Sequence, residues 1–380
     1  MKVNYFEVTG LFGSPEPISG QLNSDLNLLT GRNGTGKTSI LKLLWFTLSG
    51  NILLALKEIE FRKFTLETDC YRVVIHRLTR VTCRIEYKSD TEDFVSEDEH
   101  DADGEFAFNA EDPVNSRLRE FGGSVFLPTF RRIEGGFGLS DSRQNAWSSS
   151  LLLGKKNPIE NALQELAKEL SNKQHTFVTS ISTVDIASLL LAKYTELSDT
   201  YTKIQQETSQ RVISTIKAYE SDQDDLLDDR ESADEVIANI KTLIENLDGE
   251  REEVMRPIEA VRDLVQNLIG KVGIKFGTRL NFGDAANAIN SDLLSAGEKQ
   301  MLSFICYNAF YQNAIIVIDE PELSLHVDWQ RQLFSILMEQ QSTNQFIVST
   351  HSPFIYNKYP DREVALYSDR GDSEGEVVIA

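Results

Sequence analysis

The stretch from Gly31 to Thr38 has the residue types and spacing of a phosphate-binding loop. Its glycines allow successive backbone N–H groups to curl around an anion. An apolar run at 26–30 predicts a strand before the loop, and the pattern at 39–46 predicts a helix after it. A helix that begins at the loop presents its positive end to the anion. The alternative is a glycine-rich turn before a core helix, but motif and context together favour the phosphate loop.

Two side chains of this loop have distinct expected roles. The ammonium group of Lys37 would reach the β- and γ-phosphates of a nucleoside triphosphate, and the hydroxyl of Thr38 would bind Mg²⁺. The loop and the residue after it are expected to contact the nucleotide, namely Arg32, Asn33, Gly34, Thr35, Gly36, Lys37, Thr38 and Ser39.

Two acids, Asp319 and Glu320, follow an apolar run at 315–318 that predicts a buried strand. A carboxylate at the carboxyl end of such a strand is placed to hold Mg²⁺ through water, and we expect this metal-binding role for Asp319. Glu320 would orient or deprotonate the attacking water in phosphoryl transfer. The alternative is a strand end that merely carries two acids.

Two further motifs lie near the carboxyl end of the chain. Ser295 and Glu298 have the spacing of a capping box at a helix start, with Gly297 between them. The same helix start also offers a hydroxyl and backbone N–H groups to an anion. His351 follows a predicted strand at 345–350, where its neutral ring would contact the γ-phosphate or the attacking water. A purely structural histidine is the alternative.

An α/β architecture with a helical insertion must position these motifs. Alternating β-branched and aromatic residues at 64–87 predict antiparallel strands, and an acidic stretch at 90–112 predicts a solvated loop or short hairpin. Apolar residues at helical spacing from 157 to 270, around an acidic break, predict an antiparallel helical arm. We therefore expect three segments, which are 1–150 for the first part of a nucleotide-binding head with a β lobe, 151–270 for the coiled-coil-like insertion, and 271–380 for the second part of the head.

Individual elements follow from the same patterns. Strands are expected at 3–8, 26–30, 124–129, 271–276, 280–282, 315–318, 345–350, 363–367 and 376–379, and helices at 296–312 and 327–341. Because the carboxyl ends of parallel strands meet at one edge of a sheet, this order predicts that the motif residues gather there.

Composition limits the classes of function. The net charge is −21 over 380 residues, so a uniformly basic nucleic-acid-binding surface is not expected, although the sum leaves room for a local basic patch. Cys70, Cys83 and Cys306 show neither metal-binding nor disulfide spacing, which suits a reducing compartment. With no apolar run of membrane-spanning length and no signal peptide, we expect a cytoplasmic protein without membrane contact.

Taken together, the motifs resemble those of ABC-type ATPase heads. The relevant branch includes SMC proteins, their DNA-repair relatives and the OLD-like ATPases of phage defence. Residues 31–38 are similar to the Walker A motif, 294–300 to the signature motif, and 315–320 to Walker B with its catalytic glutamate. The pattern DEPE followed by LH at 319–326 looks like the D-loop of the OLD-like branch, and His351 matches the switch histidine.

The resemblance covers roughly residues 1–150 and 270–380, and it implies a fold, cofactors and an assembly. The implied fold is an α/β P-loop NTPase head with an antiparallel β lobe and an inserted helical arm. The implied activity is hydrolysis of ATP with Mg²⁺, with Glu320 and His351 as catalytic residues. In this family the signature residues of one subunit complete the ATP site of another, so Ser295, Gly297 and Glu298 would act across a homodimer or larger oligomer.

Two departures from the family pattern stand out. No Q-loop glutamine follows the strand at 124–129, where Thr129, Arg131 and Arg132 lie instead, with Gln144 farther on. The inserted arm is also much shorter than an SMC coiled coil, and it has no recognisable hinge or zinc hook.

The resemblance also suggests a biological role. OLD-like nucleases carry a Toprim domain after the ATPase, and with only a few residues after Pro353 we do not expect one here. We therefore expect an ATPase subunit that controls a separately encoded effector, such as a Toprim or HNH nuclease, in response to a phage trigger protein. Such a subunit would resemble those of anti-phage systems of the PARIS, Septu or retron-associated kind.

Two other functions remain open. One is a DNA-repair or chromosome-maintenance ATPase that clamps DNA directly, although the acidic balance argues mildly against it. The other is a nucleotide-gated scaffold with little turnover. A transporter ATPase fits the arm and the DEPE pattern poorly.

Overall fold

The computed structural model describes residues 1–100, 106–129, 132–133, 158–172, 174–181, 183–221, 233–270, 295–340 and 342–367. The chain divides into two compact units, of which one is Met1–Ser182 with Leu294–Ala380 and the other is Thr183–Leu293. Three of the expected strands, at 271–276, 280–282 and 376–379, lie outside the described residues, as does most of the acidic break.

A parallel sheet forms the centre of the first unit. Its order is β12-β10-β14-β15-β3-β16, and every neighbouring pair is parallel. All residues of β3, β14 and β15 are buried, as expected for parallel strands covered on both faces. The strands are β3 (Leu26–Thr30), β10 (Gly123–Leu127), β12 (His175–Phe177), β14 (Ala314–Asp319), β15 (Gln345–Ser349) and β16 (Glu363–Ala365).

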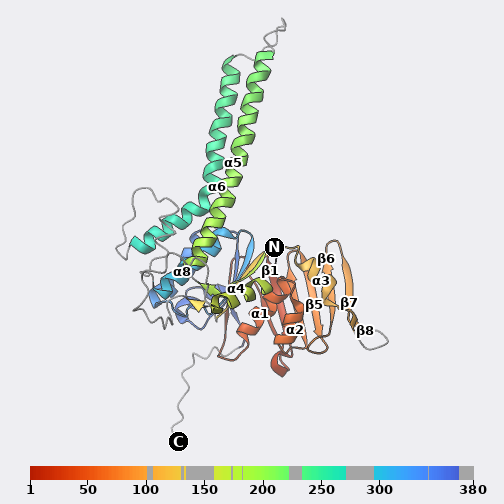
Figure 1. Cartoon of the computed structure of the whole chain (residues 1–380). Helices are drawn as coiled ribbons and strands as arrows, with labels where there is room; N and C mark the ends of the chain where they lie inside the picture. The colour runs from red at the N-terminus through yellow and green to blue at the C-terminus, as the bar shows by residue number, and fades with distance from the viewer. Residues whose placement is uncertain are drawn as a thin grey trace. The chain divides into compact units, whose positions relative to one another are not determined.

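A second, antiparallel sheet forms the β lobe of the same unit (Figure 1). Its order is β2-β1-β4-β5-β6-β7, and the antiparallel strands expected at 64–87 are confirmed. The acidic stretch contributes β7, which pairs with β6, and both acids of β7 lie at exposed positions. The strands are β1 (Val3–Thr9), β2 (Ile18–Gln21), β4 (Lys63–Thr68), β5 (Tyr71–Arg77), β6 (Cys83–Ser89), β7 (Asp93–Glu97), and a separate pair β8 (Glu99–His100) and β9 (Phe106–Phe108).

Helix α1 (Lys37–Leu48) lies between the two sheets, where it contacts β14 and β15 on one side and β4 on the other. It belongs to one hydrophobic core shared by both sheets, in which the Trp45 ring stacks on Phe126 with centroids 5.7 Å apart. The remaining helices of this unit are α2 (Ile52–Glu58), α3 (Glu111–Leu118), α4 (Pro158–Leu170), α8 (Ala296–Phe310), α9 (Val327–Glu339) and α10 (Pro353–Tyr356).

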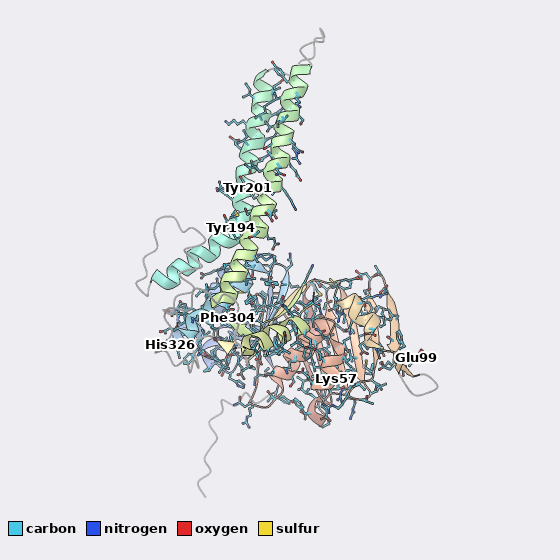
Figure 2. All side chains as sticks on the ribbon, viewed as in Figure 1. Lys57, Glu99, Tyr194, Tyr201, Phe304 and His326 are labelled. Carbon is cyan, nitrogen blue, oxygen red and sulfur yellow. The ribbon has the colours of Figure 1, made fainter. Side chains whose placement is uncertain are left out.

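The second unit contains two long helices, α5 (Thr183–Ser221) and α6 (Ala233–Gly270). They run side by side over much of their length, and the last part of α6 bends away from α5 (Figure 1). The Arg251 guanidinium lies 5.8 Å from the centroid of the Tyr201 ring, so residues near the middle of each helix face one another. Such a pairing is that of an antiparallel hairpin of helices. Tyr194 and Tyr201 are labelled on α5 in Figure 2.

The helical unit begins at Thr183 in the structure, later than the expected segment 151–270. Helix α4 and strand β12 belong to the first unit instead, because β12 pairs with β10 at the edge of the parallel sheet. A strand of three residues shows too little alternation to be found between two helical patterns. No helix among the described residues is both long enough and apolar enough to cross a membrane.

His175 at this sheet edge gives the fold a pH dependence. The side chain is fully buried, with Nδ1 2.8 Å from the hydroxyl oxygen of Ser124, and burial lowers its pKa from 6.5 to about 4. Between pH 6.5 and pH 4 the unfolded chain binds a proton on His175 that the folded chain does not. The free energy of unfolding is therefore highest above pH 6.5 with respect to this group, and it falls as the pH is lowered toward 4. The shift corresponds to about 3 kcal/mol.

Urea unfolding at pH 7 and pH 5 measures this effect. The wild type should lose stability at pH 5, and His175→Gln should lose less between the same two pH values because it lacks the titrating ring. An equal loss in both proteins would contradict the assignment. His76→Gln is the control, because that imidazole is partly exposed.

Candidate functional site

The loop between β3 and α1 curls back on itself. The hydroxyl of Thr35 donates to the carbonyl oxygen of Arg32 at 2.9 Å, and the Thr35 N–H approaches the same oxygen at 3.4 Å. Gly36 has a φ of 88°, and a Cβ there would lie 2.7 Å from Cδ2 of Leu11. Only glycine satisfies both constraints, so the turn that starts α1 depends on it. Arg32, Asn33 and Gly34 are exposed, and Ser39 is partly buried.

Lys37 is held between the loop and a group of acids. Its ammonium group donates to the carbonyl oxygens of Gly31 and Arg32 at 2.8 and 2.9 Å, and the residue is 5% exposed. Burial lowers the pKa of Lys37, while the carboxylates of Glu320, Asp319 and Glu322 act in the opposite direction. The hydrogen bonds to Gly31 and Arg32 hold the Lys37 ammonium group beside the loop amides, where a phosphate would bind.

Asp319, at the end of β14, is fully buried and accepts hydrogen bonds from three hydroxyls. Oγ1 of Thr38 is 2.9 Å from Oδ2 and 3.1 Å from Oδ1, so the structure brings the two expected metal ligands together. The other donors are Ser349, at the end of β15, and Thr129, just after β10. Carboxylate and hydroxyl oxygens are ligands that suit Mg²⁺, and Thr38 and Asp319 would hold it here.

Glu320 and His351 face each other across the ends of β14 and β15. Oε1 of Glu320 lies 3.8 Å from Nε2 of His351, and both side chains keep partial exposure, at 27% and 32%. The Glu320 backbone has a φ of 48°, and its N–H donates to the carbonyl oxygen of Ser349 at 3.1 Å. A glutamate in left-handed backbone is strained, and such strain is concentrated at functional sites.

Glu322 is a residue that sequence reasoning placed only within the D-loop pattern. Its carboxylate accepts from the His351 N–H at 2.5 Å and from the Thr350 hydroxyl at 3.0 Å. Burial raises the pKa of Glu322, and these hydrogen bonds oppose the rise. The carboxylate thus fixes the backbone that carries His351. Its spacing two residues after Glu320 was visible in the sequence, but its partners just after another strand were not.

Glu322→Ala should therefore lower kcat for ATP hydrolysis by about tenfold with little change in KM, because the backbone beneath His351 loses two hydrogen bonds. The kcat of Glu322→Gln should lie between those of Glu322→Ala and the wild type, since the amide oxygen of glutamine can still accept one hydrogen bond. Steady-state kinetics measures both values. A rise in KM with kcat unchanged would instead place Glu322 in nucleotide binding.

Ser295, Gly297 and Glu298 form the start of α8. Ser295 and Glu298 make a full capping box, with the Ser295 N–H donating to Oε2 of Glu298 at 2.8 Å and the Glu298 N–H to Oγ of Ser295 at 3.3 Å. A Cβ at Gly297 would lie 2.6 Å from the Ser324 carbonyl oxygen, so this glycine permits close packing. The side-chain hydrogen bonds described for Ser295 and Glu298 join these two residues and do not reach the loop at 31–38.

The region expected to replace the Q-loop is described only at 128–129 and 132–133, and there it contacts the acid at the end of β14. Thr129 donates to Asp319, and Arg132 lies in β11 (Arg132–Ile133), which pairs with β13 (Ser180–Ile181). Arg131 and Gln144 lie outside the described residues. Thr129 could be suspected from its place after a strand, as could Ser349, but a hydroxyl alone carries no motif.

Comparisons with known proteins agree with this P-loop geometry. A family model described as "AAA ATPase domain" matches residues 1–356. Endonuclease GajA of Bacillus cereus (strain VD045) is 37% identical over 79 residues, which cover 19% of this chain and 14% of that protein. The matched part is thus a small fraction of either protein.

Two solved structures are similar over most of the chain. One is the Smc head domain with an extended coiled coil bound to the C-terminal domain of ScpA, from Pyrococcus furiosus, with 12% identity, a TM-score of 0.37 and coverage of 94% of this chain and 91% of that one. The other is the Smc head domain with a coiled coil and joint from Pyrococcus yayanosii, with 12% identity, a TM-score of 0.36 and coverage of 94% and 93%. Likeness at this level says nothing about what this chain binds.

The family match spans the phosphate loop, the strand that ends in Asp319, and His351. The expected α/β P-loop ATPase fold is confirmed, and so is the resemblance to this class of ATPase. The chain belongs to the AAA ATPase domain family.

Proposed function

We propose that this chain binds and hydrolyses ATP with Mg²⁺, oligomerises through its head, and controls a separately encoded effector nuclease in anti-phage defence. The observation that carries the proposal is the convergence of Lys37, Thr38, Asp319, Glu320 and His351 at the carboxyl edge of one parallel sheet. This edge is where open α/β sheets bind their ligands.

The arrangement suits phosphoryl transfer to water. Lys37 and the loop amides would neutralise the phosphates, while Thr38 and Asp319 would hold the metal ion, which supplies further charge neutralisation when bound. Glu320 is partly exposed beside His351, so its carboxylate would accept a proton from the attacking water, and the imidazole would donate a hydrogen bond to the γ-phosphate. Such chemistry needs positioning more than covalent participation.

Oligomerisation is supported by the position of the signature residues. Ser295 and Glu298 bond to each other, and Ser295 is exposed at the start of α8. Neither side chain has a described hydrogen bond to the phosphate loop of its own chain. To serve a nucleotide held by a second copy, this helix start would exchange its bonds to the Glu298 carboxylate for bonds to the phosphates. The partial likeness to a protein named an endonuclease supports a connection with nuclease function, and the resemblance to OLD-like ATPases supports a role in phage defence.

A mixing experiment tests the shared site. Lys37→Met and Ser295→Arg should each be inactive alone, because each disables one half of every ATP site. Mixed, they should regain roughly a quarter of the wild-type rate, since a dimer with one copy of each holds one intact site. A Ser295→Arg protein that hydrolyses ATP normally, or a mixture that stays inactive, would contradict the shared site.

The effector is tested by co-expression with a nuclease from a neighbouring reading frame. The nuclease should co-elute with the wild-type chain and change its elution or its DNA cleavage when ATP is added. The same behaviour with Lys37→Met would show that nucleotide does not control the association, and absence of any association would contradict the effector role.

A further inference from the structure

Three side chains with metal-ligating atoms meet inside the β lobe, far along the chain from the phosphate loop. They are Cys83 at the start of β6, Asp98 just after β7, and Glu111 at the start of α3, and their ligand atoms all lie within 4.8 Å of one another. Cys83 is fully buried and Glu111 is 5% exposed. Figure 1 shows β6, β7 and α3 gathered at one end of this lobe.

The Asp98 carboxylate is fixed between a strand and a helix. Oδ2 accepts from the Cys83 N–H at 2.6 Å, and Oδ1 accepts from the Ala110 N–H at 2.8 Å. Each oxygen retains a lone pair, so these hydrogen bonds orient the carboxylate and leave it able to bind a metal ion. The side chain is only partly buried, which leaves a route for water to this side of the cluster.

Glu111 supplies the observation that points to a ligand. Its Oε2 is buried and has no hydrogen-bond donor among the residues that the structure describes. The basic group that acts on it is Lys57, labelled in Figure 2, whose effect on the pKa of Glu111 is the weakest of those described. A buried carboxylate oxygen without a donor is costly, and a second carboxylate beside it adds to the cost.

We propose that Cys83, Asp98 and Glu111 bind a zinc ion, with water as the fourth ligand. One thiolate and two carboxylates more than balance the charge of the ion and suit its borderline-soft character, whereas Mg²⁺ and Ca²⁺ take oxygen ligands alone. Bond lengths of about 2.0–2.3 Å place tetrahedral ligand atoms roughly 3.3–3.7 Å apart, which is compatible with three atoms that lie within 4.8 Å of one another.

Such an ion would join β6, the end of β7 and α3, which are elements of the β lobe rather than of the ATP site. The competing explanation is that Glu111 is protonated and shares its proton with Asp98. The zinc ion and the shared proton can be distinguished by experiment, because only the zinc ion requires the sulfur of Cys83.

Cobalt titration of the full chain tests this site. Reduced, EDTA-dialysed protein without nucleotide should bind about one equivalent of Co²⁺ with a thiolate-to-cobalt charge-transfer band in the near ultraviolet, and Zn²⁺ should abolish that band. Cobalt at Thr38 and Asp319 would give no such band, since these residues offer only oxygen. Loss of ATPase activity is therefore no part of the readout, and the outcome is independent of the proposed function.

Matched variants make the result specific. Cys83→Ser should remove the band, and Glu111→Gln should weaken Co²⁺ binding at least tenfold, with circular dichroism verifying that each variant folds. Cys70→Ser and Asp112→Asn should leave the band unchanged, because Cys70 is a partly exposed thiol beside Asp69 and Asp112 is an exposed acid in the same helical turn. No band in the wild type, or a band that survives Cys83→Ser, would overturn the zinc site and favour the shared proton.

Discussion

Glu320→Gln should lower kcat for ATP hydrolysis by about 10²–10³-fold and leave the affinity for ATP close to that of the wild type. The amide has the shape of the carboxylate but cannot accept the proton of the attacking water. It also leaves the Lys37, Thr38 and Asp319 contacts intact, and those contacts are the ones expected to hold the nucleotide. Phosphate release measures kcat, and a fluorescent ATP analogue measures the dissociation constant.

The control for this variant is Glu339→Gln, an exposed acid at the end of α9, which should hydrolyse ATP at the wild-type rate. With turnover blocked, the bound nucleotide should also hold subunits together, so Glu320→Gln with ATP should sediment as a larger species than the wild type. A Glu320→Gln protein with normal kcat would refute the role of general base and leave His351 as the residue to examine next.

Lys37→Met should raise the dissociation constant for ATP by at least about 10²-fold, which corresponds to loss of charge-assisted contacts to two phosphates. Methionine matches the length of the lysine stem and lacks the ammonium group. In the folded chain that group also bonds to the carbonyl oxygens of Gly31 and Arg32, so thermal unfolding must be followed alongside binding.

Lys42→Met is the matched control, because Lys42 lies in the same helix but forms a partly exposed ion pair with Glu58 at 2.8 Å. Lys42→Met should bind ATP normally, because the Lys42 ammonium group pairs with Glu58 and not with the phosphate loop. It should also fold normally, since partly exposed ion pairs contribute little to stability. Equal affinity in Lys37→Met and Lys42→Met would show that the loop amides alone bind the phosphates.

The elements that carry the site were predictable because their signals are local. Buried parallel strands are near-continuous apolar runs, and those at 26–30 and 315–318 agree with β3 and β14 in the structure. The phosphate loop, the acids after β14 and His351 are short motifs whose geometry follows from a strand end, and topology alone then brings them together.

Other features depend on contacts that no local pattern encodes. The acidic stretch at 90–112 predicted either a solvated loop or a short hairpin, and only the pairing of β7 with β6 decides for the hairpin there, because exposed acids suit both. Thr129, Ser349 and Glu322 matter only because of what they bond to on neighbouring strands. The same is true of Cys83, which has no metal-binding spacing in the sequence and meets its acidic neighbours through β6 pairing with β7.

The left-handed backbone of Glu320 places the stability of the fold in conflict with the proposed role of this residue in ATP hydrolysis. A φ of 48° costs a non-glycine residue about 1–2 kcal/mol, which glycine would largely avoid. A library of variants selected for expression or heat resistance alone should therefore enrich glycine at this position, whereas under the proposed function selection for phage resistance should retain the glutamate. The two selections applied to one library would separate what the residue does for the enzyme from what it costs the fold.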